Sequence, residues 1–214
     1  MTGSVRVKIC GLTRLQDVDA VVAAKADYIG LNFFARSPRL VSAAQARALA
    51  LATPVGMARV GLFVDADDAT IDAVLADVPL DMLQLHGHET PERLADLRRR
   101  HGLPLIKAVG VADASDLPAL AVYGHVADML LVDAKPPRDA ILPGGNGLAF
   151  DWRLIAGRRW PVPWMLAGGL VPGNVAEAIA LTGTRQVDVA SGVESAPGIK
   201  DADKIAQFVV AAQV

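Results

Sequence analysis

The sequence predicts an α/β protein, a single-domain (β/α)8 barrel (TIM barrel) that spans residues 1–214. Short apolar runs of the length of buried strands alternate with helical patterns eight times along the 214 residues. This alternation is typical of a parallel sheet covered by helices, and eight repeats favour closure of the sheet into a barrel. The chain is compact for that fold, whose usual length is ~250 residues. No linker interrupts the pattern, so one domain is expected.

Each predicted strand is an apolar run bounded by turn residues, and each is followed by a helical pattern. The strands are expected over residues 5–9, 27–33, 57–64, 82–86, 104–109, 127–133, 163–167 and 186–190. The helices are expected over residues 14–25, 43–51, 66–76, 91–100, 115–122, 152–155, 172–181 and 201–212. Four predicted N-caps have side-chain oxygens that can accept hydrogen bonds from the first helical N–H groups: Thr13, Ser42, Asp65 and Thr90.

A doubly wound open sheet is the alternative architecture for this alternation. Folds of that kind often bind nucleotides through G-x-G-x-x-G after the first strand, or through a P-loop that ends in Gly-Lys-Ser/Thr. Neither motif occurs at the expected place in this sequence. The closed barrel is therefore favoured.

Composition and charge point to a soluble protein of a reducing compartment. The formal net charge of -2 gives no attraction to nucleic acid or to anionic membranes. No apolar run reaches the roughly 18–20 residues of a transmembrane helix, and the first residues lack the pattern of a signal peptide. A single cysteine cannot form an internal disulfide. We therefore expect a cytoplasmic protein without nucleic-acid or membrane partners, either a monomer or a homodimer.

Several predicted strands carry polar residues, although strands covered on both faces should be apolar. Lys8 and Cys10 lie two residues apart and share a face of their strand, as do Gln84 and His86. The other polar residues in question are Asn32, Lys107, Asp133 and Asp188. Because helices cover the outside, these side chains are expected inside the barrel. They would form either an internal network of ion pairs or a catalytic site at the carboxyl ends of the strands.

Two glycine-containing segments, 167–170 and 191–194, follow the last two predicted strands. In barrels, loops at these positions often bind phosphate through backbone N–H groups, and glycine lets the backbone approach the anion closely. A phosphorylated small-molecule substrate is therefore expected. The predicted phosphate-binding residues are Gly168, Gly169, Ser191 and Gly192.

A set of motifs, taken together in order and spacing, resembles the phosphoribosylanthranilate isomerase family. The matching segments are Lys-Ile-Cys-Gly-Leu-Thr at 8–13, Asn-Phe-Phe-Ala-Arg-Ser-Pro-Arg at 32–39, Gln-Leu-His-Gly at 84–87, Leu-Val-Asp at 131–133, Gly-Gly-Asn-Gly at 144–147, Phe-Asp-Trp at 150–152, Ala-Gly-Gly-Leu at 167–170, Asp-Val-Ala-Ser-Gly-Val-Glu at 188–194, Pro-Gly at 197–198 and Lys-Asp at 200–201. The resemblance covers nearly the whole chain.

The resemblance implies an isomerase of tryptophan (aromatic amino acid) biosynthesis with a (β/α)8 fold. It would convert N-(5-phosphoribosyl)anthranilate to 1-(2-carboxyphenylamino)-1-deoxyribulose 5-phosphate, an Amadori rearrangement. The matching motifs imply Cys10 as the general base and Asp133 as the general acid.

Two proton transfers explain why such chemistry needs an acid and a base. The ring oxygen must be protonated so that the furanose opens to an iminium, which a carboxylic acid with a raised pKa can do. The C2′ proton must then leave, which a thiolate can accept if its pKa is lowered, and Lys8 is a candidate cation for that. The cationic imine acidifies C2′, so we expect no organic cofactor and no metal.

The motifs also imply substrate contacts for Arg39, His86 and Asp188. Arg39, favoured over Arg36 by its motif, would pair with the anthranilate carboxylate. His86 would line the site or lie as a satisfied core residue. Asp188 would contact the substrate or form an ion pair with Lys8 or Lys107.

The segment 144–147 is a candidate lid over the substrate. Leu148 stands where the family pattern leads us to expect a basic residue, which leaves the contacts of that lid open.

Other functions are open from the residues alone. A ribulose-phosphate epimerase would need metal-binding histidines and acids at several strand ends, and only His86 is so placed. A bifunctional isomerase that also acts on the histidine-pathway substrate would use two aspartates. A sugar-phosphate-binding barrel without catalysis would need neither Cys10 nor Asp133, and Cys10 would then be a small buried apolar side chain.

Overall fold

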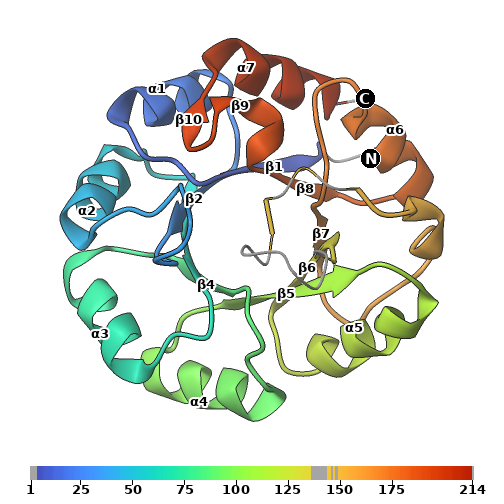
Figure 1. Ribbon diagram of the computed structural model, residues 1–214, viewed down its shortest axis with the longest axis horizontal. Coiled ribbons are helices and arrows are strands. Elements are labelled where there is room, and N and C mark those ends of the chain that lie inside the picture. The colour runs from blue at the N-terminus through green and yellow to red at the C-terminus, as the bar shows by residue number, and fades with distance from the viewer. Residues whose placement is uncertain (1–3, 136–143, 146, 148, 214) are drawn as a thin grey trace.

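A computed structural model describes residues 4–135, 144–145, 147 and 149–213. Eight parallel strands form a closed barrel, in which each strand pairs with the next and the last pairs with the first (Figure 1). The strands are β1 (Arg6–Cys10), β2 (Tyr28–Asn32), β3 (Ala58–Phe63), β4 (Met82–Leu85), β5 (Leu105–Val111), β6 (Met129–Ala134), β7 (Trp164–Leu166) and β8 (Gln186–Val189). The predicted (β/α)8 barrel is confirmed.

Helices surround the barrel as an outer ring (Figure 1). The described residues form seven α-helices: α1 (Leu15–Ala23), α2 (Ala43–Ala52), α3 (Asp68–Asp77), α4 (Pro91–His101), α5 (Leu117–Gly124), α6 (Val175–Thr182) and α7 (Ala202–Ala211). Three 3₁₀ helices accompany them: η1 (Ala114–Asp116), η2 (Trp152–Leu154) and η3 (Ser191–Val193). A hairpin of β9 (Glu194–Ala196) and β10 (Ile199–Lys200) precedes α7 and is absent from the sequence-based prediction.

The connection between β6 and β7 holds η2 in place of an α-helix, among its described residues. The short helix expected over 152–155 is therefore present, in the tighter 3₁₀ form. Asp151 caps it by accepting a hydrogen bond from the N–H of Arg153 at 3.0 Å. Gly157 then takes a φ of 68°, and Pro161 follows without an N–H to continue a helix. Gly157 and Pro161 therefore limit the helix after Asp151 to a single turn.

Two of the four predicted N-caps are confirmed. Ser42 and Thr90 each accept a hydrogen bond from the third residue of α2 and α4, respectively. Thr13 is not the N-cap of α1, because its hydroxyl donates to the carbonyl oxygen of Gly198 at 2.9 Å. Arg14 takes the N-cap position instead.

The predicted cap of α3 is also wrong. Asp65 has a φ of 48°, a left-handed conformation, and its Oδ1 accepts a hydrogen bond from the N–H of His88 at 2.6 Å. Asp67 caps the helix, with its side chain accepting from the N–H of Thr70. The Asp65 carboxylate instead ties the loop after β3 to the loop after β4.

Apolar side chains fill two layers of the molecule. The larger layer lies between the outer faces of the strands and the helices. A smaller cluster lies inside the barrel and consists of Tyr28, Val60, Ile106, Ala108, Met129, Leu131, Met165 and Ala167. The polar groups inside the barrel therefore pack beside apolar side chains.

Lys107 does not point into the barrel as expected. Its neighbours Ile106 and Ala108 belong to the interior cluster, so the alternation along β5 directs Lys107 outward. There its Nζ lies 2.7 Å from Oε2 of Glu89 and 5.4 Å from the centre of the Tyr123 ring. Glu89 is buried too, so the charge of Lys107 is paired under the outer layer of helices.

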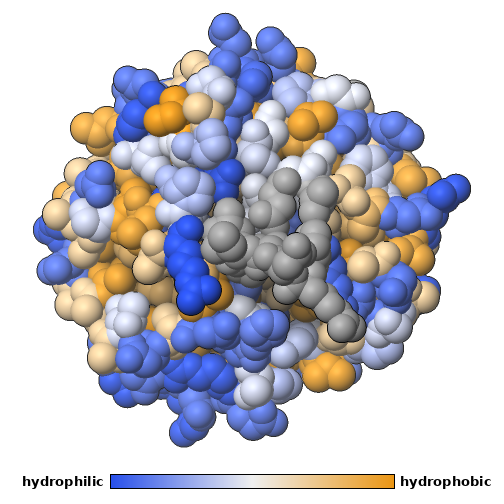
Figure 2. Space-filling view, in the orientation of Figure 1, coloured by the Kyte–Doolittle hydropathy of each residue, from blue (hydrophilic) through white to orange (hydrophobic). Residues whose placement is uncertain are grey.

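Within the part of the chain that the structure describes, none of the helices combines the length and the hydropathy needed to span a bilayer. The large exposed apolar side chains are Leu15, Val22, Leu40, Leu51, Val55, Val122, Val171, Leu181, Ile199 and Val210. Apolar residues are scattered among hydrophilic ones on the face seen in Figure 2.

Candidate active site

A cavity of about 760 Å³, open to solvent, lies at the carboxyl ends of the barrel strands. All the residues that the sequence assigns to the site line this cavity: Cys10, Arg39, His86, Asp133, Gly168, Gly169, Asp188, Ser191 and Gly192. Closure of the barrel thus brings together segments from both ends and the middle of the chain. Barrel enzymes hold their small ligands at this end of the barrel.

Lys8 and Asp188 form an ion pair inside the barrel. Nζ of Lys8 lies 2.8 Å from Oδ1 of Asp188, and the Lys8 side chain has no exposed surface. Of the two partners expected for Asp188, Lys8 is the one observed. Burial alone would lower the pKa of Lys8, but the negative charges of Asp188 and Cys10 outweigh it and raise that pKa. A fully buried ammonium needs such partners.

Cys10 is buried beside this pair, at the end of β1. Burial raises the pKa of the Cys10 thiol, and Asp188 adds to the rise, whereas the charges of Lys8 and Lys200 oppose it. Lys8 therefore acts in the expected direction, but burial outweighs it, and the expected net lowering of the thiol pKa is wrong for the protein without substrate. A Cβ on Gly30 would lie 2.7 Å from Sγ, so glycine at this position leaves the sulfur its room.

Asp133, on β6, contacts the ring of His86, which follows β4. Oδ2 of Asp133 lies 3.2 Å from Nε2 of His86. Nε2 of Gln84 lies 2.9 Å from Nδ1 of the same ring. Because an amide nitrogen donates, Nδ1 accepts, and the ring proton faces Asp133. Oδ1 accepts a hydrogen bond from the N–H of Ala134 at 2.8 Å, so both carboxylate oxygens are held.

The segment predicted as a lid packs on the acid through Gly144. A Cβ there would lie 2.5 Å from Oδ2 of Asp133 and 2.7 Å from Nε2 of His86. Gly145 and Gly147 also line the cavity. Asn146 and Leu148 lie outside the described residues, and the movement of this segment stays a prediction.

Arg39 reaches over the cavity from the loop after β2. Its Nε and Nη2 atoms donate to Oε1 and Oε2 of Glu194 at 2.7 and 2.9 Å. Burial alone would lower the pKa of Arg39, but the hydrogen bonds and charge of Glu194 outweigh it and raise that pKa. The Nη1 side of the guanidinium faces Gly145, where a Cβ would lie only 2.9 Å from Nη1. One edge of Arg39 is thus fixed by Glu194, and the other faces the cavity lining.

The glycine segments after β7 and β8 pack against their neighbours so closely that side chains would not fit. Gly168 and Gly169 have φ values of 83° and 65°, which favour glycine. A Cβ on Gly168 would lie 2.5 Å from the backbone N of Ala134, and one on Gly192 would lie 1.9 Å from the carbonyl oxygen of Leu170. The two segments therefore form one backbone-lined wall, which continues into η3.

Comparisons with known proteins agree over nearly the full chain. A family model described as N-(5'phosphoribosyl)anthranilate (PRA) isomerase matches residues 7–211. The chain belongs to the PRA isomerase family.

Individual members of the PRA isomerase family are similar in sequence and in structure. The N-(5'-phosphoribosyl)anthranilate isomerase of Paracoccus denitrificans is 62% identical over 209 residues, which cover 98% of this chain and 97% of that protein. The crystal structure of phosphoribosyl anthranilate isomerase from Thermotoga maritima has a TM-score of 0.88 and 38% identity, covering 97% of this chain and 98% of that one. A PRA isomerase structure in complex with reduced 1-(o-carboxyphenylamino)-1-deoxyribulose 5-phosphate has a TM-score of 0.85 and 37% identity, with the same coverage.

The sequence-based prediction of a PRA isomerase site identified residues that face the cavity and missed charges behind it. Glu194 and Lys200 stand in segments that match the family, yet no role was apparent for either. Their side chains are buried and paired, with Nζ of Lys200 2.8 Å from Oε1 of Glu194. Strands of three and two residues are too short for alternation to reveal which side chains point inward. Among the described residues, no three His, Cys, Asp or Glu side chains cluster as a metal site requires.

Proposed function

We propose that the chain isomerises N-(5'-phosphoribosyl)anthranilate with Cys10 as the general base and Asp133 as the general acid. The isomerase activity, in tryptophan biosynthesis, follows from membership of the family. The observation that carries the assignment of roles is that Cys10 and Asp133 line the same cavity from β1 and β6. These strands are not neighbours in the barrel, so the two groups can reach a bound sugar from different sides.

The acid acts first in the proposed sequence. Asp133 donates a proton to the furanose ring oxygen, the C1′–O bond breaks, and the nitrogen lone pair forms the iminium. His86 and the N–H of Ala134 hold the carboxyl group so that its orientation is fixed before the substrate arrives.

Cys10 first releases its own proton to water in the open cavity; the thiolate then takes the proton from C2′, and the electron pair of the C–H bond moves to the iminium to give an enolamine. The enolamine tautomerises to the ketone product. The thiol of the protein without substrate has a raised pKa, so the positive charge of the iminium has to assist its ionisation. The substrate itself supplies the electron sink, which is why the mechanism needs neither a metal nor an organic cofactor.

The remaining cavity residues would hold the two anionic ends of the substrate. Backbone N–H groups of Gly168, Gly169, Ser191 and Gly192 are proposed to bind the phosphate. The guanidinium of Arg39 is proposed to bind the anthranilate carboxylate through its edge that Glu194 leaves open.

His86 and Asp188 are proposed to contact the sugar between these anchors, since both line the cavity. For Asp188 this adds to its ion pair with Lys8, which uses Oδ1.

Localisation, partners and oligomeric state are also part of the proposal. We propose that the protein is cytoplasmic, has no nucleic-acid partner, and forms one domain over its whole length. Its oligomeric state is proposed to be monomer or homodimer. One solved relative, from Thermotoga maritima, is described as dimeric and was converted to monomers.

A fluorescence assay that follows the loss of freshly made substrate tests the proposal. Cys10→Ser and Asp133→Asn should each lower kcat at least a hundredfold, with circular dichroism and binding of a reduced product analogue retained. Arg39→Ala should chiefly raise KM. Near-normal kcat in Cys10→Ser or Asp133→Asn would remove that residue from its role, and binding without turnover in the unaltered protein would leave a sugar-phosphate-binding barrel.

A further inference from the structure

We propose that Glu194 and Lys200, which do not line the cavity, are positioning residues of the isomerisation. Glu194 fixes one edge of the Arg39 guanidinium, and Lys200 provides positive charge beside Cys10. Because Glu194 pairs with both cations, it links the residue proposed to bind the substrate carboxylate to the residue proposed as the base. The inference rests on the roles proposed above for Cys10 and Arg39.

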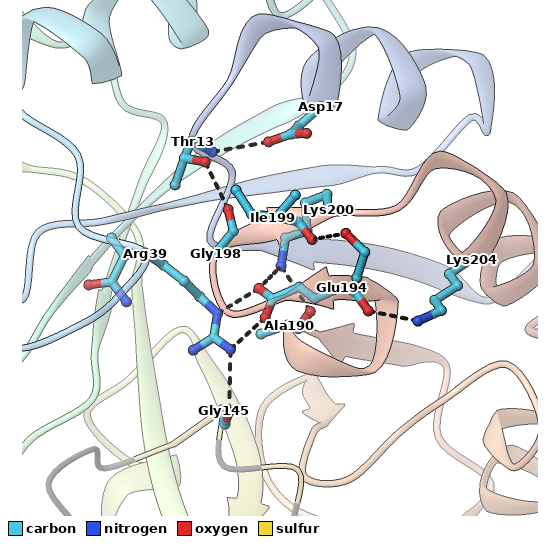
Figure 3. Close-up of polar contacts among 12 residues, drawn as sticks. Thr13, Asp17, Arg39, Gly145, Ala190, Glu194, Gly198, Ile199, Lys200 and Lys204 are labelled. Atoms are coloured by element: carbon cyan, nitrogen blue, oxygen red, sulfur yellow. Dashed lines mark hydrogen bonds and ion pairs between the residues drawn. The ribbon is translucent and has the colours of Figure 1, made fainter.

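Glu194 is the common partner of two buried cations (Figure 3). Arg39 donates to both of its carboxylate oxygens, and Lys200 donates to Oε1 at 2.8 Å. All three side chains are at most 8% exposed. Burial alone would raise the pKa of Glu194, but the hydrogen bonds from Arg39 and the charge of Lys200 outweigh it and lower that pKa. The carboxylate is therefore held in its charged form.

The cluster lies at the level of Cys10 in the barrel. Nζ of Lys200 also donates to the carbonyl oxygen of Ala190 at 2.8 Å. Ala190 is the residue after Val189, which pairs with Ile9, the residue before Cys10. On the other side, a Cβ on Gly11 would lie 2.4 Å from Cδ of Arg39, so the Arg39 chain packs directly over the residue that follows Cys10.

The charged side chains around Cys10 do not balance one another. In the described part of the chain, the charged groups around Cys10 come from β1, β8, the loop after β2 and the β9–β10 hairpin. Lys8 and Asp188 neutralise each other, whereas Glu194 faces two cations. With both lysines charged, the set has one positive charge in excess, and a buried excess charge is unfavourable unless an anion balances it. A Cys10 thiolate, or a substrate carboxylate at Arg39, is such an anion. Burial accordingly outweighs the pairing of Lys200 with Glu194 and lowers the pKa of Lys200.

The hairpin that carries both residues contacts the segment after β1 and the loop after β2, and Figure 3 shows the contact between Thr13 and Gly198. Thr13 donates to the carbonyl oxygen of Gly198, and Nη2 of Arg14 donates to that of Lys200 at 2.8 Å. A Cβ on Gly198 would lie 2.6 Å from the carbonyl oxygen of Pro38, so the hairpin also touches the loop of Arg39. These contacts fix where the charges of Glu194 and Lys200 stand.

The pKa of the thiol separates this role from simple support of the fold. Cys10 is the only cysteine, so ultraviolet absorbance of the thiolate and the rate of alkylation both report on it alone. Loss of the Lys200 charge should raise the thiol pKa by about one unit, which is roughly a tenfold smaller thiolate fraction at a fixed pH. The variant to test is Lys200→Met. If it does not fold, Lys200→Gln replaces it.

Two further lysine variants are the matched controls. Lys200→Arg keeps the charge and should keep the thiol pKa near that of the unaltered protein. Lys204→Met removes a lysine of the same region whose Nζ donates to the backbone oxygen of Glu194 at 2.7 Å, and it should leave the thiol pKa unchanged. An unchanged thiol pKa in Lys200→Met and Lys200→Gln, or an equal rise in Lys204→Met, would overturn the proposal for Lys200.

Glu194→Gln tests the second half of the proposal. Arg39 would lose the carboxylate that fixes its edge, so KM should rise roughly tenfold while the thiol pKa does not rise. An unchanged KM would show that Arg39 needs no such support. The thiol measurements require no turnover, so they remain decisive for Lys200 even if Cys10→Ser proves active and the proposed base is wrong.

Discussion

Nε2 of His86 lies 3.2 Å from Oδ2 of Asp133, so a ring carried by the end of β4 touches a carboxylate carried by β6. Gln84 holds the other ring nitrogen at 2.9 Å, from the same face of β4. The ring is thus fixed between an amide below it and the proposed acid beside it.

Replacement of His86 should therefore impair the acid more than the base. In His86→Ala we expect kcat to fall roughly 10- to 100-fold, because the carboxyl group loses its fixed orientation. Alkylation of Cys10 should proceed as in the unaltered protein. Steady-state kinetics and alkylation rates measure the two effects, and His88→Ala, two residues away with an exposed side chain, is the control. Equal losses in both variants would show a general disturbance of the loop.

Removal of the partner of Lys8 should destabilise the fold. Asp188→Ala leaves a fully buried ammonium without its carboxylate, which should reduce the free energy of unfolding by about 3–5 kcal/mol. The pKa of Lys8 is raised in the folded protein, so its contribution is complete below about pH 10.4 and is lost as the pH rises through the folded pKa. Urea denaturation at neutral pH would measure the loss. A double variant, Lys8→Met with Asp188→Leu, should recover part of it, and a stable Asp188→Ala protein would contradict the role of the pair.

The Cys10 thiol should be poorly reactive before substrate binds. Its pKa is raised by burial above the ordinary value of about 8.5, so only a few per cent or less is thiolate at neutral pH. Iodoacetamide should therefore modify the protein slowly at neutral pH and faster as the pH rises, with a midpoint above that ordinary value. Cys10→Ser supplies the baseline. A midpoint below about 8 would mean that Lys8 and Lys200 outweigh burial.

Alanine should be tolerated less well at the glycines of the backbone-lined wall after β7 and β8 than at a glycine outside it. Gly168→Ala places a Cβ 2.5 Å from a backbone nitrogen at a φ of 83°, and should cost about 1–3 kcal/mol of stability and raise KM. Gly173→Ala, in the same connection between β7 and α6, meets no atom within 4 Å and should alter neither quantity. Thermal unfolding and KM for the phosphorylated substrate measure the difference. Tolerance of Gly168→Ala would speak against a tight backbone wall there.

The periodicity of apolar residues in the sequence was sufficient to predict the barrel, because each strand and helix has a pattern that is local in the chain. The same local logic explains why every residue assigned to the cavity lines it, since strand ends converge on one face. It failed for Lys107, whose inward or outward direction depends on the register of β5 against its neighbours. That register places Ile106 opposite Gln84 and turns Lys107 toward Glu89.

Long-range partners were beyond the reach of local patterns. The carboxylate that holds Arg39 is 155 positions away, on a strand of three residues. Thr13 has the residue type and position of an N-cap, yet the hairpin that arrives from the far end of the chain takes its hydroxyl. The lowering of the Cys10 pKa by Lys8 was expected from adjacency alone, and burial, a property of the whole fold, outweighs it.

The partner that Lys8 needs is 180 positions further along the chain. During synthesis, β1 leaves the ribosome long before β8 exists, and until then the Lys8 ammonium can stay solvated only if the barrel remains open. Early closure around an unpaired ammonium would cost several kcal/mol. The ion pair at the β1–β8 seam therefore makes burial of Lys8 favourable only in a chain that already has its eighth barrel strand.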